Sequence, residues 1–110
     1  MTQLFMYTRE RICGDQHLAR QCLKDLGVSY TEVNISREAD AAQELADLVG
    51  CLAIPTLLVG DEERRPLAPP DPLAPSRSVR NVDRGSVISE PTREGLRQFL
   101  IKHALLPPTT

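Results

Sequence analysis

The sequence predicts an α/β fold in which a mixed four-stranded sheet is flanked by three helices, in the order βαβαββα. Three observations lead to it. Short apolar runs alternate with segments of helical periodicity, a glycine follows each of the first two helical segments, and a strand and a helix close the chain. A strand–helix–strand unit joins its two strands in parallel, whereas the two later strands are expected to pair antiparallel. Helices on both faces of the sheet follow from this order.

The first half of the chain is predicted to form strand, helix, strand and helix. Residues 2–7 are a short apolar run, typical of a central strand that is covered on both faces. Residues 14–26 carry one apolar stripe at helical spacing. Residues 29–35 alternate with a period of two, which predicts a second strand. Residues 37–49 predict a second helix, for which Ser36 is the expected N-terminal cap.

The second half is predicted to hold a strand, a long loop, another strand and a closing helix. Residues 56–59 form the strand, which Pro55 begins because proline cannot donate a hydrogen bond within a ladder. Residues 62–84 contain five of the chain's nine prolines and many charges, so we expect a mobile or partly polyproline loop. A short strand over residues 85–89 follows, and Pro91 marks the expected start of the last helix.

Length and composition restrict the classes of function. A chain of 110 residues suits one small domain over residues 1–110, in which residues 62–84 are a loop insertion. The formal net charge of −2 gives no basic footprint for nucleic acid. No apolar run approaches the ~18 residues of a membrane span, and the first residues lack the features of a secretory signal. Three cysteines make a poor disulfide framework, so we expect a cytoplasmic protein that contacts neither nucleic acid nor membrane.

Two short motifs resemble a known family. The stretch LFMYTRERIC, residues 4–13, is similar to a strand that ends in Tyr-Thr-Lys and leads to a catalytic cysteine, with Arg9 in place of the lysine. The stretch GCLAIPTLLV, residues 50–59, is similar to a segment whose proline is cis and lies beside that cysteine. These motifs resemble those of the thioredoxin superfamily and, within it, the glutaredoxins. The resemblance implies a thioredoxin-like fold, a catalytic Cys13 and a cis peptide bond before Pro55.

Cys13 is the candidate nucleophile. It precedes the first turn of the helix predicted over residues 14–26, where backbone N–H groups favour the thiolate, and Gly14 lets a ligand approach the backbone closely. Glutaredoxins carry Cys-Pro-Tyr-Cys or, in monothiol members, Cys-Gly-Phe-Ser at this place. This chain has Cys-Gly-Asp-Gln, in which Gln16 takes the place of the second cysteine. The Cys-Gly start is therefore closer to the monothiol pattern.

The resemblance implies a thiol–disulfide oxidoreductase that acts on glutathione mixed disulfides through one cysteine. Glutathione would be the co-substrate, and glutathione and glutathionylated proteins would be the partners. Before the last helix, glutaredoxins hold the far end of glutathione with a Gly-Gly-x-Asp turn. VISEPT, residues 87–92, stands there in this chain, and Glu90 would repel a carboxylate. The implied substrate-binding residues are Arg9, Gly14, Gln16, Ile54, Pro55 and Ser89.

The positions of the other two cysteines predict different roles for them. Cys22 lies on the apolar stripe, ~13 Å along the helix from Cys13, so it is expected in the core and beyond disulfide reach. Cys51 is either a resolving cysteine or a small loop residue.

Two other functions are alternatives to a thiol–disulfide oxidoreductase. They are a glutathione-assisted iron–sulfur cluster carrier, as in monothiol relatives, and a non-catalytic binding module with a thioredoxin fold. No cysteine–histidine set has ligand spacing, so no metal is expected.

Overall fold

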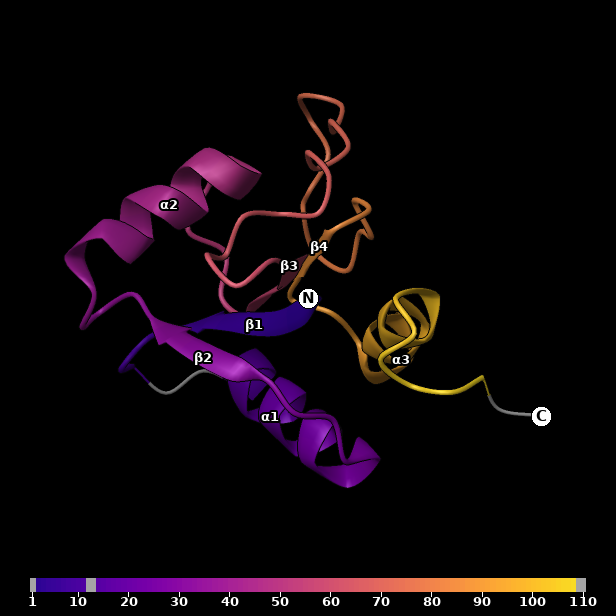
Figure 1. Ribbon diagram of the computed structural model, residues 1–110. Helices are drawn as coiled ribbons and strands as arrows, with labels where there is room; N and C mark the ends of the chain where they lie inside the picture. The colour runs from indigo at the N-terminus through magenta and orange to yellow at the C-terminus, as the bar shows by residue number, and fades with distance from the viewer. Residues whose placement is uncertain (1, 12–13, 109–110) are drawn as a thin grey trace.

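The computed structural model describes residues 2–11 and 14–108, and over them it shows the predicted βαβαββα order (Figure 1). The strands are β1 (Gln3–Thr8), β2 (Thr31–Asn34), β3 (Thr56–Gly60) and β4 (Val87–Ser89). The helices are α1 (Gly14–Leu26), α2 (Ala39–Val49) and α3 (Arg93–Lys102). The bounds of α1 agree with the prediction, whereas β2 and β4 are shorter than the strands predicted there.

The sheet has the strand order β2-β1-β3-β4. β1 pairs in parallel with β2 and antiparallel with β3, and β3 pairs antiparallel with β4, so the predicted mixed sheet is confirmed. Near the end of β1, Tyr7 lies opposite Thr56, the first residue of β3. The chain therefore leaves β1 close to Pro55. The Ile54–Pro55 peptide bond is cis, as the resemblance implied.

Helices cover both faces of the sheet, with α1 and α3 on one face and α2 on the other (Figure 1). Alternate residues of β1 supply the two cores, because successive side chains of a strand point to opposite faces. The buried cluster on the α1 and α3 face contains Leu4, Met6, Ala19, Cys22, Leu23, Leu57, Val59, Ile88, Leu96, Phe99 and Leu100. The buried cluster on the α2 face contains Phe5, Tyr7, Val33, Ala41, Leu45, Val49, Ile54, Leu58 and Val87.

The predicted start of α2 is wrong. The helix begins at Ala39, and Glu38, which precedes it, makes no side-chain capping bond. The backbone N–H of Glu38 donates to the carbonyl of Asn34 at 3.0 Å and closes a turn there, which delays the helix. Ser36 lies within that turn and accepts a hydrogen bond from the backbone N–H of Glu10 instead of capping the helix.

The start of α3 also differs from the prediction. The helix begins at Arg93 rather than near Pro91, because Thr92 is the N-cap. The Thr92 hydroxyl accepts a hydrogen bond from the backbone N–H of Gly95 at 3.0 Å, which satisfies one of the donors that a helix start leaves open.

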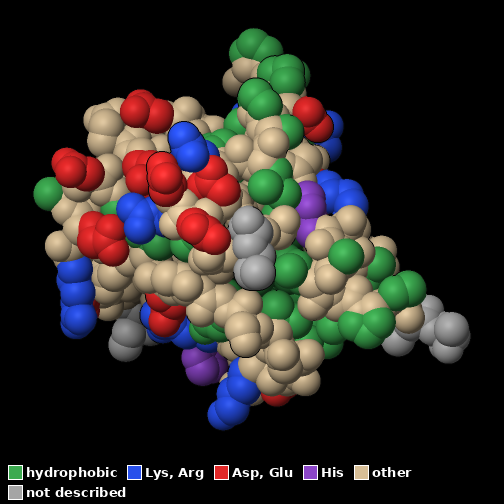
Figure 2. Space-filling model, in the orientation of Figure 1, with side chains coloured by type: hydrophobic (Ala, Val, Ile, Leu, Met, Phe, Trp, Pro, Cys, Tyr) green, Lys and Arg blue, Asp and Glu red, His purple; other side chains and the backbone are tan. Residues whose placement is uncertain are grey.

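The proline-rich loop, residues 62–84, connects β3 to β4 and contains none of the helices or strands described above. It rises from the body as a long excursion in Figure 1, and Figure 2 shows mainly hydrophobic side chains at its tip. Hydrogen bonds nevertheless tie both of its ends to the sheet. Leu67 donates to the carbonyl of Val59 at 3.2 Å, and Asn81 donates to the carbonyl of Ser89 at 2.8 Å. The returning end thus lies alongside β4.

Candidate active site

The candidate site lies where β1 ends and α1 begins. Cys13, the predicted nucleophile, lies outside the described residues. The residues on either side of it are described, and they show how this connection is held. Gly14, the first residue of α1, is exposed, and a Cβ atom there would meet nothing within 4 Å. The described residues therefore place no close neighbour that requires a glycine at this position.

Gln16 braces the β1–α1 connection. Its side-chain Oε1 accepts a hydrogen bond from the backbone N–H of Arg9 at 3.0 Å, and its Nε2 donates to the carbonyl of Arg9 at 3.2 Å. The side chain is only 3% exposed. The amide therefore satisfies both backbone groups of one residue across the connection. Sequence reasoning missed this bracing role, although a glutamine in place of a second cysteine was the available signal. A contact between Gln16 and substrate stays a prediction.

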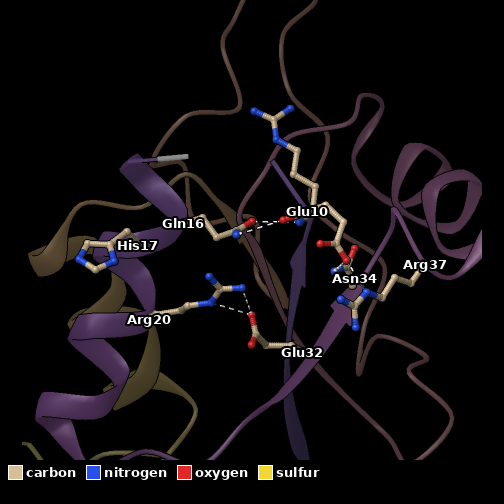
Figure 3. A pocket seen from close by; sticks show the side chains of 8 residues that line it. Glu10, Gln16, His17, Arg20, Glu32, Asn34 and Arg37 are labelled. Carbon is tan, nitrogen blue, oxygen red and sulfur yellow. Dashed lines mark hydrogen bonds and ion pairs between the residues drawn. The ribbon is translucent and has the colours of Figure 1, made fainter. Parts of the chain in front are cut away.

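Arg9 borders a cavity of about 520 Å³ between α1 and β2. Its Nε atom is shielded from solvent and has no hydrogen-bond partner among the described residues. In the same cavity, Arg20 of α1 and Glu32 of β2 point toward each other and form an ion pair of 2.7 Å (Figure 3). His17 is exposed on the first turns of α1 and also lines the cavity.

The segment before β3 is bound to the turn before α3. The carbonyl of Pro55 accepts a hydrogen bond from the backbone N–H of Glu90 at 2.7 Å. Glu90 has a φ of 45°, in the left-handed region that favours glycine. Ile54 is buried in the core on the α2 face. The structure thus places Pro55 next to the VISEPT segment, residues 87–92.

The polar groups of the VISEPT turn are engaged within the chain. Ser89 is 3% exposed, and its hydroxyl shares a hydrogen bond of 2.7 Å with the hydroxyl of Thr56. The backbone N–H of Thr92 donates to Oδ1 of Asn81 at 2.9 Å. A carboxylate bound at this turn would have to displace these contacts. The predicted contact between Ser89 and substrate stays untested.

Asp15 and Glu90 share one cation, which comes from the proline-rich loop. Arg80 donates from Nη1 to Asp15 Oδ2 at 2.7 Å and from Nη2 to Asp15 Oδ1 at 3.1 Å. Its Nη1 also lies 3.0 Å from Glu90 Oε1. The hydrogen bond from Arg80 holds the pKa of Asp15 below its usual value. Arg80 therefore offsets one of the two negative charges at this place, where Glu90 was expected to disfavour an anion.

A model of the family described as glutaredoxin matches residues 4–63, which is more than half of the chain. The chain belongs to the glutaredoxin family. The match spans β1, α1 and the cis Ile54–Pro55 bond, and the thioredoxin-like α/β fold agrees with it. The glutaredoxin match supports a redox function of this coarse type. No curated protein matches the chain, and no described helix is long and apolar enough to cross a membrane.

The two described cysteines of this glutaredoxin have contrasting surroundings. Cys22 is 4% exposed in the core beneath α1 and α3, as predicted, and burial raises the pKa of its thiol. Cys51 is exposed and lines a cavity of about 510 Å³ between the end of α2 and the proline-rich loop. Among residues 2–11 and 14–108, no group of three or more His, Cys, Asp or Glu side chains is placed to hold a metal ion.

Proposed function

We propose that the protein is a thiol–disulfide oxidoreductase that acts on glutathione mixed disulfides through Cys13. The observation that carries the proposal is the glutaredoxin match over residues 4–63. It includes both the connection that contains Cys13 and the cis Ile54–Pro55 bond. Support also comes from the pairing of Tyr7 with Thr56, because this pairing makes the chain leave β1 close to Pro55.

The chemistry needs one thiolate and glutathione. The Cys13 thiolate attacks the glutathione sulfur of the mixed disulfide, the original S–S bond breaks, and the substrate leaves as a thiolate that takes up a proton. Cys13 then carries glutathione as a disulfide. A second glutathione thiolate attacks that bond, oxidised glutathione leaves, and the Cys13 thiolate is regenerated. Over the whole cycle, the mixed disulfide and one glutathione become the free substrate thiol and oxidised glutathione, so the substrate sulfur is reduced and the sulfur of the second glutathione is oxidised. No second active-site cysteine is required, which agrees with Gln16 at that position.

Arg9 is the residue that we propose to bind a carboxylate of glutathione. The Nε of Arg9 has no acceptor among the described residues and is shielded from water. An incoming carboxylate would satisfy it, and a bond between two charged partners is stronger than one between neutral groups. At the opposite end of the site, Ser89 and Thr92 are already engaged within the chain. The proposal therefore assigns more of the glutathione affinity to Arg9 than to the VISEPT turn.

The test is the reduction of a glutathionylated peptide by glutathione, measured for the wild type and four variants. Cys13→Ser is expected to lower the rate to the uncatalysed background, whereas Cys51→Ser keeps it. Arg9→Ala is expected to raise the KM for glutathione by about tenfold at nearly constant kcat, the size of one charged hydrogen bond. Arg65→Ala removes an exposed arginine that pairs with Asp61, and serves as the matched control. Equal rates for Cys13→Ser and the wild type would refute the proposal.

The same variants examine a resolving role for Cys51. Cys51 is exposed in the segment before Pro55, so it is open to a second disulfide partner. If it resolves mixed disulfides, Cys51→Ser slows the reduction of a protein disulfide but leaves the reduction of glutathione mixed disulfides unchanged.

The two alternative functions have separate readouts. A cluster carrier would become coloured after anaerobic reconstitution with iron and sulfide in the presence of glutathione, and Cys13→Ser would stay colourless. A non-catalytic binding module would leave the reduction of the mixed disulfide at its background rate. The occupied polar groups of the VISEPT turn are the observation that favours the second alternative.

A further inference from the structure

Arg80 reaches the candidate site from a segment remote in the sequence. Its guanidinium makes a two-pronged contact with Asp15 in the first turn of α1, and one further contact with Glu90. Asp15 is the second residue after Cys13, and the backbone N–H of Glu90 donates to the carbonyl of Pro55. Both carboxylates therefore border the candidate site on the side of the proline-rich loop.

The backbone around Arg80 fixes where its side chain begins. Arg80 forms a parallel bridge with Ser89, and the backbone N–H of Asn81 donates to the Ser89 carbonyl at 2.8 Å. The side-chain oxygen of Asn81 accepts from the backbone N–H of Thr92, which precedes α3. The two residues are thus tied to β4 and to the start of α3. These contacts hold the backbone of Arg80 in place, whereas an arginine on a loop without such contacts would not be held.

Arg80 also lowers the net negative charge beside the site. Over the described part of the chain, it is the one cation within ion-pair distance of Asp15 or Glu90. Asp15 is charged at neutral pH, as an aspartate normally is, and the hydrogen bond from Arg80 lowers its pKa further. Without Arg80, two negative charges would stand where an anionic substrate has to approach. Glutathione carries two carboxylates and one ammonium, so it would be repelled.

We propose that Arg80 is a positioning residue of this site, which pairs with both Asp15 and Glu90, offsets one of their two negative charges and so eases the approach of anionic thiol substrates. The inference rests on the proposed function, because it concerns access to Cys13. It adds a selectivity for substrate charge to that function, and it gives the returning end of the proline-rich loop a role in the reaction.

The test compares an anionic and a neutral reagent of similar size at the same thiol. Cys13 is alkylated with iodoacetate and with iodoacetamide in a Cys51→Ser background, in which Cys22 is buried. Arg80→Ala is expected to lower the ratio of the iodoacetate rate to the iodoacetamide rate about twofold. The variant loses one unit of positive charge, and a single charge that acts through water over several ångströms changes the rate of an anion by a factor of roughly two. Arg80→Lys, which keeps the charge, is expected to keep most of the ratio. The matched control is Arg77→Ala, since Arg77 belongs to the same loop and has no described ion pair.

Variants that remove the carboxylates show whether the change in the rate ratio arises from charge or from a change in structure. The triple variant Arg80→Ala/Asp15→Asn/Glu90→Gln lacks all three charges, so the net charge at these positions rises from −1 to 0 and its ratio is expected to recover from that of Arg80→Ala to about twofold above the wild type. Asp15→Asn alone leaves Arg80 with one partner and is expected to raise the ratio about twofold. This single variant keeps the arginine, so it tests the inference even if Arg80→Ala does not fold. Both shifts are expected to shrink at 1 M salt, because surface charges are then screened within about 3 Å.

The outcomes distinguish failure of this inference from failure of the proposed function. If the wild type does not turn over glutathione mixed disulfides but the ratio falls in Arg80→Ala, the proposed function is wrong and the charge role of Arg80 stands. If the wild type is active but the ratio is unchanged in Arg80→Ala and in Asp15→Asn, the inference is overturned. It is also overturned if the ratio falls in Arg80→Ala and the triple variant does not restore it.

Discussion

Replacement of Gln16 by alanine should destabilise the protein more than a substitution on the same helix normally would. The change removes two hydrogen bonds to the backbone of Arg9, at 3.0 and 3.2 Å. Each such bond contributes about 1 kcal/mol net. Because the side chain is buried, water reaches the freed N–H and carbonyl of Arg9 only in part. The expected loss is therefore about 2 kcal/mol in the free energy of unfolding.

The assay is thermal and urea unfolding of the variant in parallel with the wild type. A loss of this size lowers the Tm of a domain of this length by roughly 8–12 °C. Gln21→Ala is the matched control, because Gln21 lies on the same helix and bonds an exposed partner four residues on, Asp25. The control should change stability by less than about 0.5 kcal/mol. If Gln16→Ala and Gln21→Ala unfold within 0.5 kcal/mol of each other, the amide of Gln16 does not brace the connection.

Three further predictions concern the core, the cysteines and acid stability. Phe99→Ala should cost about 3–5 kcal/mol in the free energy of unfolding, because the ring is fully buried between α3 and the sheet; a loss below 1 kcal/mol in urea unfolding would contradict this. In the Cys13→Ser variant, alkylation at neutral pH should modify Cys51 and leave Cys22 intact until the chain unfolds, as peptide mass analysis can show. Arg80 lowers the folded-state pKa of Asp15, so the pair stabilises the protein above about pH 4 and loses this effect as the pH falls through the folded-state value. The difference in unfolding free energy between wild type and Arg80→Ala should accordingly shrink from pH 7 to pH 2, and a constant difference would exclude an ionic contribution.

The order of the helices and strands could be predicted because it depends on local patterns of apolar residues. The apolar stripe of α1 and the apolar run of β1 depend on residues close in sequence, and α1 lies where the pattern places it while β1 is shifted by one residue. The cis bond before Pro55 followed from a motif rather than from physics, since a sequence alone does not determine which prolyl bonds are cis.

The starts of α2 and α3 could not be predicted well, because several short polar residues compete to cap each helix. Ser36 and Thr92 are both suitable caps by type. Thr92 caps α3, whereas the turn on the carbonyl of Asn34 draws Ser36 away from α2. The distinction depends on backbone hydrogen bonds that the residue types do not reveal.

The ion pair between Arg80 and Asp15 could not be predicted from the sequence either. Asp15 and Arg80 are 65 positions apart, and their contact requires that the proline-rich loop return alongside β4. No periodicity specifies that return path. For the same reason, the sequence predicts that Glu90 repels a carboxylate but could not show that Arg80 pairs with it.

The measurement that tests the central claim most directly is the site of glutathione transfer. The reduced protein is mixed with an equimolar glutathionylated peptide at neutral pH, quenched with acid within seconds, and mapped by peptide mass analysis. The account predicts that glutathione is found on Cys13 and that Cys13→Ser acquires none in the same time. Glutathione found first on Cys51, or its transfer to Cys13→Ser at the rate of the wild type, would contradict the account.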